Sequence, residues 1–275
     1  MKIYDCFMFY NEFDLLDIRL EELGPYVDYF VVIEQNLTHR GKEKELNFAK
    51  RASDSEIVSK YRHKIITYTS NVTDPEKVLS DKLHIERQHR NAVQDFAKQL
   101  DESILLVSDL DEIPIGETLI GLEKKVHPHQ YAMYFMYYGL KYLKSFLAHT
   151  TVVCTQKDLD RFTSAENLKT MYRGRLPTIE KSGWHLSYFD SDPSVISDKI
   201  KSIHHSEYDL PEYTSLEKIA ERVDQGVDLF NRGGIDHLKK IEKEMNIPLP
   251  KLVSKNLEKY RNLLPEFYFD ETNIA

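Results

Sequence analysis

The sequence predicts an α/β fold in which a doubly wound, mostly parallel central sheet is flanked by helices, with a helical region at the C-terminus. Strand and helix patterns alternate four times between residues 2 and 109, which is typical of a parallel sheet. Residues 104–107 are continuously apolar, as in a buried strand. Acidic side chains follow this run directly, so we expect chemistry at the carboxyl end of the strand.

The N-terminal half supplies the alternating elements. Residues 2–9 alternate and then become apolar, which predicts the first strand. Phe13, Leu16 and Leu20 recur at helical spacing, and Gly24-Pro25 ends that helix. The further elements expected here are a strand at 27–33, a polar loop at 35–50, a short helix at 55–61, a strand at 64–68, a helix at 81–100 and the strand at 103–109.

In the C-terminal half, the predicted strands and helices alternate less regularly. The aromatic run 130–138 is expected to be a strand whose rings either fill the core or stack on a sugar. We expect helices at 117–126 and 193–203, a loop-rich segment at 155–180 and a strand at 181–189. The predicted division is a main domain over residues 1–210 and a helical extension over 211–275 packed on it. The last stretch of the extension is expected to be a loose arm or an oligomer contact.

Composition argues against several classes of protein. Of 275 residues, 41% are hydrophobic and 30% charged, as in an ordinary soluble globular protein. The formal net charge of -8 argues against nucleic acid as the main partner, because phosphate binding requires a basic face. No apolar window approaches a transmembrane segment, and Asp5 interrupts the start, unlike a signal peptide. Cys6 and Cys154 show no metal or redox spacing, so we expect a cytoplasmic protein.

The strand at 103–109 continues into Asp109-Leu110-Asp111-Glu112-Ile113-Pro114, and the proline is expected to end its pairing. Alternate residues of an extended chain point to the same side, so Asp109 and Asp111 can share one divalent cation. A hard cation such as Mg²⁺ or Mn²⁺ then fills its other positions with water and substrate phosphates, which is how a diphosphate leaving group is held. The alternative is an acidic pair in a solvated turn. An EF-hand is excluded, because Ile113 and Pro114 stand where an oxygen ligand and glycine are needed.

Other polar residues are expected at the same edge of the sheet. Asn11 and Glu12 follow the first strand and Glu34 follows the second, so they join residues 109–112 at one rim. The helix at 81–100 carries Arg87 and Arg90 on one face, which is either a solvated surface or a phosphate contact. Further along the chain, His205 and Glu207 are candidates for completing a metal site or supplying a base.

Several longer motifs occur in a fixed order and span residues 2 to about 210. They are Phe9-Tyr10-Asn11-Glu12-Phe13-Asp14-Leu15-Leu16-Asp17-Ile18-Arg19-Leu20, then Val32-Ile33-Glu34-Gln35-Asn36-Leu37-Thr38 with Gly41 and Lys44, Glu86-Arg87 with Arg90-Asn91, residues 108–114, Ser182-Gly183-Trp184-His185-Leu186-Ser187, and Lys199 with Ser202, His205 and Glu207. This set resembles glycosyltransferase family 17. The resemblance implies a GT-A fold, a UDP-sugar donor carrying GlcNAc, a divalent cation, inverting transfer to a glycan acceptor, and a soluble bacterial or viral relative.

The resemblance also implies roles for single residues. Asp109 and Asp111 would hold Mn²⁺ or Mg²⁺ against the UDP diphosphate, and His205 and His185 would complete the metal shell. The residues implied to contact the UDP-sugar are Asn11, Glu12, Glu34, Arg87, Arg90 and Asp109. Inversion requires a base that takes the proton of the acceptor hydroxyl. The candidates are Glu112, Glu180 and Glu207, and the sequence does not choose among them.

Two other classes of function stay open. A nucleotidyltransferase or phosphotransferase also places paired carboxylates after a strand, although the sequence has no G-x-x-x-x-G-K-[ST] loop. A non-catalytic carbohydrate-binding protein can keep the same fold without the chemistry. The intact Asp109-x-Asp111 pair argues against this second alternative.

Overall fold

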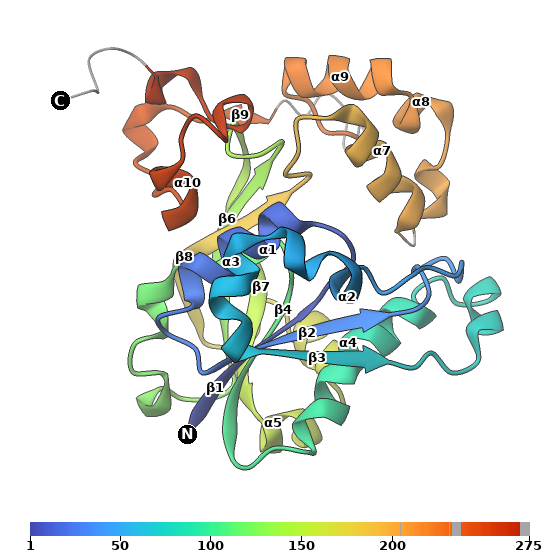
Figure 1. Ribbon diagram of the computed structural model, residues 1–275, viewed down its shortest axis with the longest axis vertical. Coiled ribbons are helices and arrows are strands. Elements are labelled where there is room, and N and C mark those ends of the chain that lie inside the picture. Colours follow the sequence, from blue (N-terminus) through green and yellow to red (C-terminus); the bar gives the residue numbers. More distant parts are fainter. Residues whose placement is uncertain (204, 231, 233–237, 270–275) are drawn as a thin grey trace.

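The computed structural model describes residues 1–203, 205–230, 232 and 238–269 (Figure 1). Residues 231, 233–237 and 270–275 of the expected C-terminal extension lie outside the described part. The strands are β1 (Lys2–Met8), β2 (Tyr29–Gln35), β3 (Ile65–Ser70), β4 (Ser103–Asp109), β5 (Glu112–Pro114), β6 (His129–Tyr137), β7 (Tyr142–Thr155), β8 (Thr178–Ser187) and β9 (Lys239–Lys240). The α-helices are α1 (Phe13–Leu23), α2 (Asn47–Arg51), α3 (Glu56–Tyr61), α4 (His84–Ala97), α5 (Gln156–Arg161), α6 (Ala165–Thr170), α7 (Pro193–Ser202), α8 (Pro211–Thr214), α9 (Leu216–Gln225) and α10 (Lys251–Lys255).

All the strands of the described residues belong to one mixed sheet with the order β3-β2-β1-β4-β7-β6-β8-β5, and β9 pairs with β7. The first four strands are parallel: β1 pairs with β2 and β4, and β2 pairs with β3. The alternation of strand and helix in the sequence therefore predicted this half correctly. Because β2 and β3 lie on one side of β1 and β4 on the other, the chain reverses direction across the sheet between β1 and β4. The carboxyl ends of two such strands form a ligand crevice in open α/β sheets.

The expectation of a mostly parallel sheet is wrong for the other half. β7 runs antiparallel to both β4 and β6, and β5 runs antiparallel to β8. The long β7 follows β6 through a short turn in which Tyr138 and Gly139 have φ of 56° and 80°. A hairpin of this kind requires no crossover helix, so it leaves no helix pattern in the sequence.

Helices cover both faces of the parallel strands. Side chains of β1 alternate, with Tyr4 and Cys6 packing against α4 on one face and Phe7 against α1 and α3 on the other. Figure 1 shows α1 and α3 on one side of β2 and β3, and α4 and α5 on the other. Burial on both faces explains why β4 is continuously apolar. The flanking helices expected from the sequence are thus confirmed.

Several local expectations are corrected by capping and turn geometry. Residues 117–126 form two short 3-10 turns separated by Gly121 at φ 74°, and not one helix. The segment 155–180 contains α5 and α6, because Thr155 and Ser164 each accept a hydrogen bond from a backbone N–H of the helix that follows. Helix α4 starts at His84 and not at residue 81.

Pro114 does not lie beyond a strand but is the last residue of β5, where it pairs with Gly183. The pairing is tolerated because β5 is at the edge of the sheet, where a missing N–H costs no ladder hydrogen bond. Gly183 permits the close approach, since a Cβ there would lie 2.3 Å from the carbonyl oxygen of Ile113. This contact fixes β5, and with it the turn after β4, against β8.

The C-terminal stretch is part of the packed molecule. Trp184 Nε1 donates to the carbonyl oxygen of Pro248 at 2.7 Å, and the buried Glu22 accepts from the backbone N–H of Lys251 at 3.0 Å. Tyr260 and Leu264 are 2% and 1% exposed. The expectation of a loose arm after Pro250 is therefore wrong for the described residues, the last of which is residue 269.

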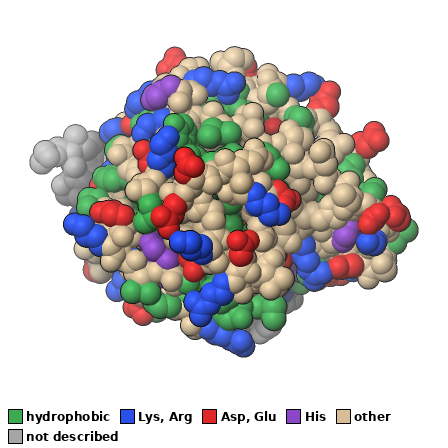
Figure 2. Space-filling view, turned by 90° about the horizontal axis from the view of Figure 1, so that it is seen from below, with side chains coloured by type: hydrophobic (Ala, Val, Ile, Leu, Met, Phe, Trp, Pro, Cys, Tyr) green, Lys and Arg blue, Asp and Glu red, His purple; other side chains and the backbone are tan. Residues whose placement is uncertain are grey.

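The face of the molecule in Figure 2 carries basic and acidic side chains interspersed, without a continuous basic area. This mixture agrees with the negative net charge. Within the described residues, no helix combines the length and apolar character needed to cross a membrane.

Candidate active site

A pocket of about 480 Å³ opens at the carboxyl ends of β1 and β4, within the range of small-molecule sites. The loop after β2 forms one wall, and α7 with the segment that follows it forms another. Six of the residues expected from the sequence line the pocket, namely Glu12, Arg90, Asp109, Asp111, His185 and His205. The crevice predicted from strand order therefore exists and is lined by charged side chains.

Asp109 ends β4 and Asp111 lies in the turn to β5, and Arg19 of α1 holds this segment. Arg19 Nη1 donates to the carbonyl oxygens of Asp109, Leu110 and Glu112 at 3.1, 3.1 and 2.9 Å. The guanidinium also forms an ion pair with Asp5 at 2.6 Å, in which both side chains are fully buried. One buried cation thus donates to three carbonyl groups within four residues, which fixes the backbone on which Asp109 and Asp111 stand.

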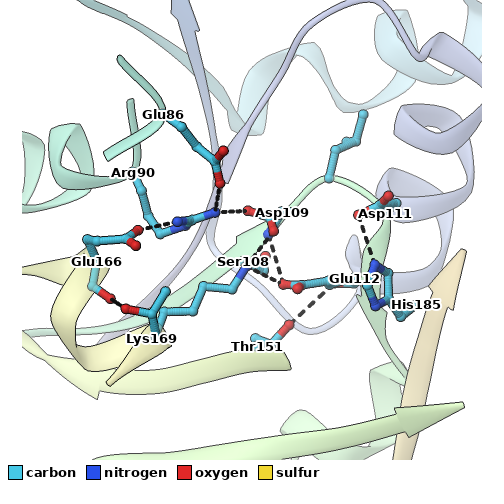
Figure 3. Close-up of polar contacts among 12 residues, drawn as sticks. Glu86, Arg90, Ser108, Asp109, Asp111, Glu112, Thr151, Glu166, Lys169 and His185 are labelled. Atoms are coloured by element: carbon cyan, nitrogen blue, oxygen red, sulfur yellow. Dashed lines mark hydrogen bonds and ion pairs between the residues drawn. The ribbon is translucent and has the colours of Figure 1, made fainter. Parts of the chain in front are cut away.

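Asp109 lies between two basic side chains (Figure 3). Its Oδ2 is 2.7 Å from Lys169 Nζ, and its Oδ1 accepts from Arg90 Nη2 at 3.2 Å. Burial by itself raises the pKa of Asp109, but Lys169 and Arg90 hold that pKa well below its usual value. Asp109 is therefore ionised, and both of its oxygens are engaged.

Lys169 and Arg90 extend this charge network to further carboxylates. Lys169 is 1% exposed, and its Nζ is also 2.7 Å from Glu112 Oε2, which accepts from the backbone N–H of Asp109 at 2.9 Å. Arg90 pairs with Glu86 at 3.1 Å and with Glu166 of α6. Figure 3 shows these groups converging from α4, α6 and β4.

Asp111 also lines the pocket, but its partners differ from those of Asp109. Its Oδ1 is 3.7 Å from His185 Nε2, and its Oδ2 is 3.4 Å from Lys199 Nζ. The His185 ring stacks on Phe135 with centroids 4.4 Å apart and planes 6° apart. The antiparallel pairing of β5 and β8 brings Asp111 and His185 together.

The oxygen and nitrogen atoms of the pocket fit a cation with few protein ligands. Such a cation takes most of its ligands from the substrate. Within the described part of the chain, no group of three His, Cys, Asp or Glu side chains is placed to hold a metal ion. Asp111 and His185 present an oxygen and a nitrogen side by side, whereas basic side chains already occupy both oxygens of Asp109. Such a partial donor set suits Mg²⁺ or Mn²⁺ bound together with phosphates.

Three residues expected to contact the donor have other partners and do not line the pocket. Asn11 Oδ1 accepts from Arg51 at 2.9 Å. Glu34 is 5% exposed and accepts from the backbone N–H of Phe48 at 3.2 Å, so it fastens the loop after β2. Arg87 pairs with Asp81 at 2.6 Å.

The three candidates for the base also differ in position. Glu112 is 2% exposed and tied to Lys169, and Glu180 is exposed on β8 away from the pocket lining. Glu207 accepts from or donates to His205 Nδ1 at 2.7 Å, depending on which group holds the proton. His205 lines the pocket, so among the three only Glu207 is joined directly to a lining side chain.

Sequence reasoning missed several residues of the site. Lys169 stands in a segment expected to be loop, where a lysine is normally exposed, and no local pattern marks it as buried. Lys199 appeared only as a member of a motif. Lys44, which likewise appeared only as a member of a motif, and Arg232 also line the pocket, together with Tyr188. These residues come from distant parts of the chain, and only folding brings them together.

Comparison with known proteins identifies relatives of this sequence. The sequence profile of glycosyltransferase family 17 matches residues 1–268. A β-1,4-mannosyl-glycoprotein 4-β-N-acetylglucosaminyltransferase from Homo sapiens is 29% identical over 117 residues, which cover 41% of this chain and 22% of the relative. Proteins of the same name from Rattus norvegicus and Mus musculus are 29% and 28% identical over the same length. The match therefore spans about a fifth of these relatives.

Proposed function

The chain belongs to glycosyltransferase family 17, and from this premise we propose that it moves GlcNAc from UDP-GlcNAc to a hydroxyl of a glycan acceptor with inversion. The relatives from human, rat and mouse carry the name of an N-acetylglucosaminyltransferase, which supports this choice of sugar. The proposed donor site is the pocket at the ends of β1 and β4.

The observation that carries the proposal is the convergence of Glu12, Asp109 and Asp111 at the point where the strand order reverses. The parallel strands β3-β2-β1-β4 with an acidic turn after β4 support a GT-A-like arrangement of the N-terminal half. Arg90, Lys44 and Lys199 line the same pocket and provide positive charge for a diphosphate. An activated sugar with a charged leaving group fits this distribution.

The mechanism we propose assigns separate tasks to the two aspartates. Asp111 and His185 would hold Mn²⁺ or Mg²⁺, which when bound stabilises the negative charge that develops on the leaving diphosphate. Asp109 stays ionised between Lys169 and Arg90, whose contacts hold its carboxylate at the pocket lining. Arg19 keeps the turn fixed, so both side chains are oriented before the donor arrives.

For the base we propose the pair His205 and Glu207. The 2.7 Å contact lets Glu207 orient the His205 imidazole, which lies on the pocket and can accept the proton of the acceptor hydroxyl. The neighbouring contacts lower the pKa of Glu207 to about 2, with the hydrogen bond to His205 as the main cause. A carboxylate of such low pKa serves better to orient a base than to act as one.

Incubation with UDP-GlcNAc and Mn²⁺ tests the proposed function. We expect release of UDP, and not UMP, measured by ion-exchange chromatography, because transfer or hydrolysis of the sugar breaks the bond at the anomeric carbon. Asp111→Asn should lower this rate by about 100-fold or more, since one transition-state contact to charge contributes several kcal/mol. Its thermal unfolding should match that of the wild type. Release of UMP would indicate a nucleotidyltransferase instead, and wild-type turnover by the variant would remove the role of Asp111.

Replacement of the proposed base is a second test. His205→Ala should lower kcat for transfer to a glycan acceptor by about 100-fold, the usual contribution of a general base, while the KM for UDP-GlcNAc changes little. Glu207→Gln should give a smaller loss in kcat, because the imidazole remains. Equal kcat for wild type and His205→Ala would assign the base elsewhere.

A further inference from the structure

Lys199 connects two carboxylates of the pocket lining, those of Glu12 and Asp111. It projects from α7, and its Nζ is 3.4 Å from Glu12 Oε1 and 3.4 Å from Asp111 Oδ2. Glu12 follows β1 and Asp111 follows β4, so this ammonium lies across the reversal point of the sheet. The Lys199 side chain is 26% exposed and forms part of the pocket lining.

The two contacts of Lys199 are longer than closed charge-assisted hydrogen bonds, which measure about 2.7–2.9 Å. The ammonium therefore interacts with both carboxylates and forms a short hydrogen bond with neither. The Lys199 ammonium lies within 3.4 Å of two carboxylates, and opposite charges at such distances favour the charged form of a lysine. A lysine stem has several rotatable bonds, so its ammonium reaches a new anion with little rearrangement of α7.

The position of this ammonium has a consequence for metal binding. It is 3.4 Å from the same Asp111 carboxylate whose other oxygen lies toward His185. A positive charge at this distance repels a divalent cation bound at Asp111. A diphosphate brings negative charge into the pocket and provides the ammonium with a stronger partner than either carboxylate.

We propose that Lys199 couples the metal to the donor: without nucleotide its ammonium neutralises Asp111 and Glu12 and weakens divalent-cation binding, and with nucleotide it contacts the diphosphate, so metal and UDP bind tightly only together. This inference rests on the proposed function, because it assumes a UDP donor. It adds to that function an order of assembly and a phosphate-binding role for a residue on α7.

The test compares wild type, Lys199→Met and Lys199→Arg by isothermal titration calorimetry with Mn²⁺ alone, UDP alone, and UDP in saturating Mn²⁺. Lys201→Met is the matched control, because Lys201 is an exposed lysine two residues along α7. Thermal unfolding checks that each variant is folded. In Lys199→Met, Mn²⁺ alone should bind about tenfold tighter, since the substitution removes the positive charge that repels a cation at Asp111.

UDP alone should bind Lys199→Met about tenfold more weakly, since one phosphate contact is lost. The affinity for Mn²⁺ should then no longer rise when UDP is present, whereas Lys199→Arg and Lys201→Met should keep the wild-type coupling. Unchanged Mn²⁺ affinity in Lys199→Met, or weaker binding of both ligands, would overturn the role of Lys199. If the wild type binds no UDP with or without Mn²⁺, the proposed donor itself is wrong, and this result is distinct from a failure of Lys199 alone.

Discussion

Asp109 and Asp111 are identical side chains two residues apart, yet their surroundings assign them different chemistry. Asp109 has a basic partner on each oxygen, Lys169 on one and Arg90 on the other. Asp111 is flanked by His185 and Lys199 at longer distances, 3.7 and 3.4 Å. A carboxylate that already has two close cations gains little from a third, and for this reason our proposal assigns the metal to Asp111.

His89 is a second residue whose protonation state depends on burial. It is 4% exposed, and its Nε2 donates to the carbonyl oxygen of Ile33 at 2.8 Å, which leaves Nδ1 to accept from His39. Burial, followed by the neighbouring His39, lowers the pKa of His89 from 6.5 to about 3. His89 therefore stays neutral in the folded protein at any pH above about 3.

We predict that the folded state loses stability as the pH falls below 6.5. Between pH 6.5 and about 3 the unfolded chain binds a proton at His89 that the folded protein does not bind. The free energy of unfolding should fall by up to ~1.4 kcal/mol per pH unit for this group. His129, whose pKa burial lowers to about 4, acts in the same direction.

Urea denaturation of wild type and His89→Gln between pH 7 and pH 5 measures this effect. The glutamine amide can still donate to Ile33 but cannot be charged, so the slope with pH should decrease. His63→Gln, at an exposed position, is the control and should keep the wild-type slope. An unaltered slope in His89→Gln would show that this histidine is protonated in the folded state.

At the scale of elements, two walls of the pocket are joined by Arg40. The loop after β2 carries Arg40, whose Nε and Nη2 donate to the carbonyl oxygens of Ile203 and Ile200 at 2.7 and 2.9 Å. Its Nη1 pairs with Asp209 at 2.5 Å. These bonds satisfy carbonyl groups at the C-terminal end of α7 and place a positive charge there, where the helix dipole favours it.

We predict that Arg40→Gln weakens UDP binding by about tenfold while the chain stays folded. The substitution removes the ion pair and at least one carbonyl contact, each contributing roughly 1 kcal/mol, so the two walls separate more easily. Calorimetry with UDP and Mn²⁺ gives the affinity. Lys42→Gln, at an exposed position of the same loop, should bind as the wild type does. If Arg40→Gln also binds normally, the two walls are held by other contacts.

At the scale of the whole molecule, the hydrophobic core does not divide at residue 210. Ile241, Val253, Tyr260 and Leu264 pack in the cluster that contains side chains of β1 and α1. Ile219, Leu229 and Phe230 pack with Tyr137 and Tyr188 beside the pocket. The proposed extension after residue 210 therefore shares its core with the proposed main domain.

We predict that a chain ending at residue 210 does not fold cooperatively. It would expose Trp184 and the apolar side chains beneath the missing segment, and the loss of several core residues at 2–5 kcal/mol each exceeds the usual stability of a domain of about 5–15 kcal/mol. Near-ultraviolet circular dichroism during thermal unfolding measures this. A sharp transition with native-like aromatic signals would show that residues 1–210 form an independent domain.

The elements that local patterns predict well are those that follow periodic spacing. β1, α1, β2, α3, β3, β4 and α7 lie close to the expected ranges, because apolar spacing and capping act over a few residues. The hairpin strand β7 and the position of Pro114 within β5 were not predicted. Both depend on which strand lies next in the sheet, and that is decided by pairing between distant segments.

The sequence by itself determined the parallel half of the sheet, the carboxyl edge where Glu12, Asp109 and Asp111 meet, and the family. These follow from the alternation of elements and from ordered motifs, which are local properties of the chain. Only the tertiary structure decided that Lys169 and Arg90 enclose Asp109, that Lys199 links Asp111 to Glu12, and that Glu34 and Arg87 face elsewhere. The physical reason is that charge partners are selected by distance in space, and residues far apart in the chain become neighbours only when the core is packed.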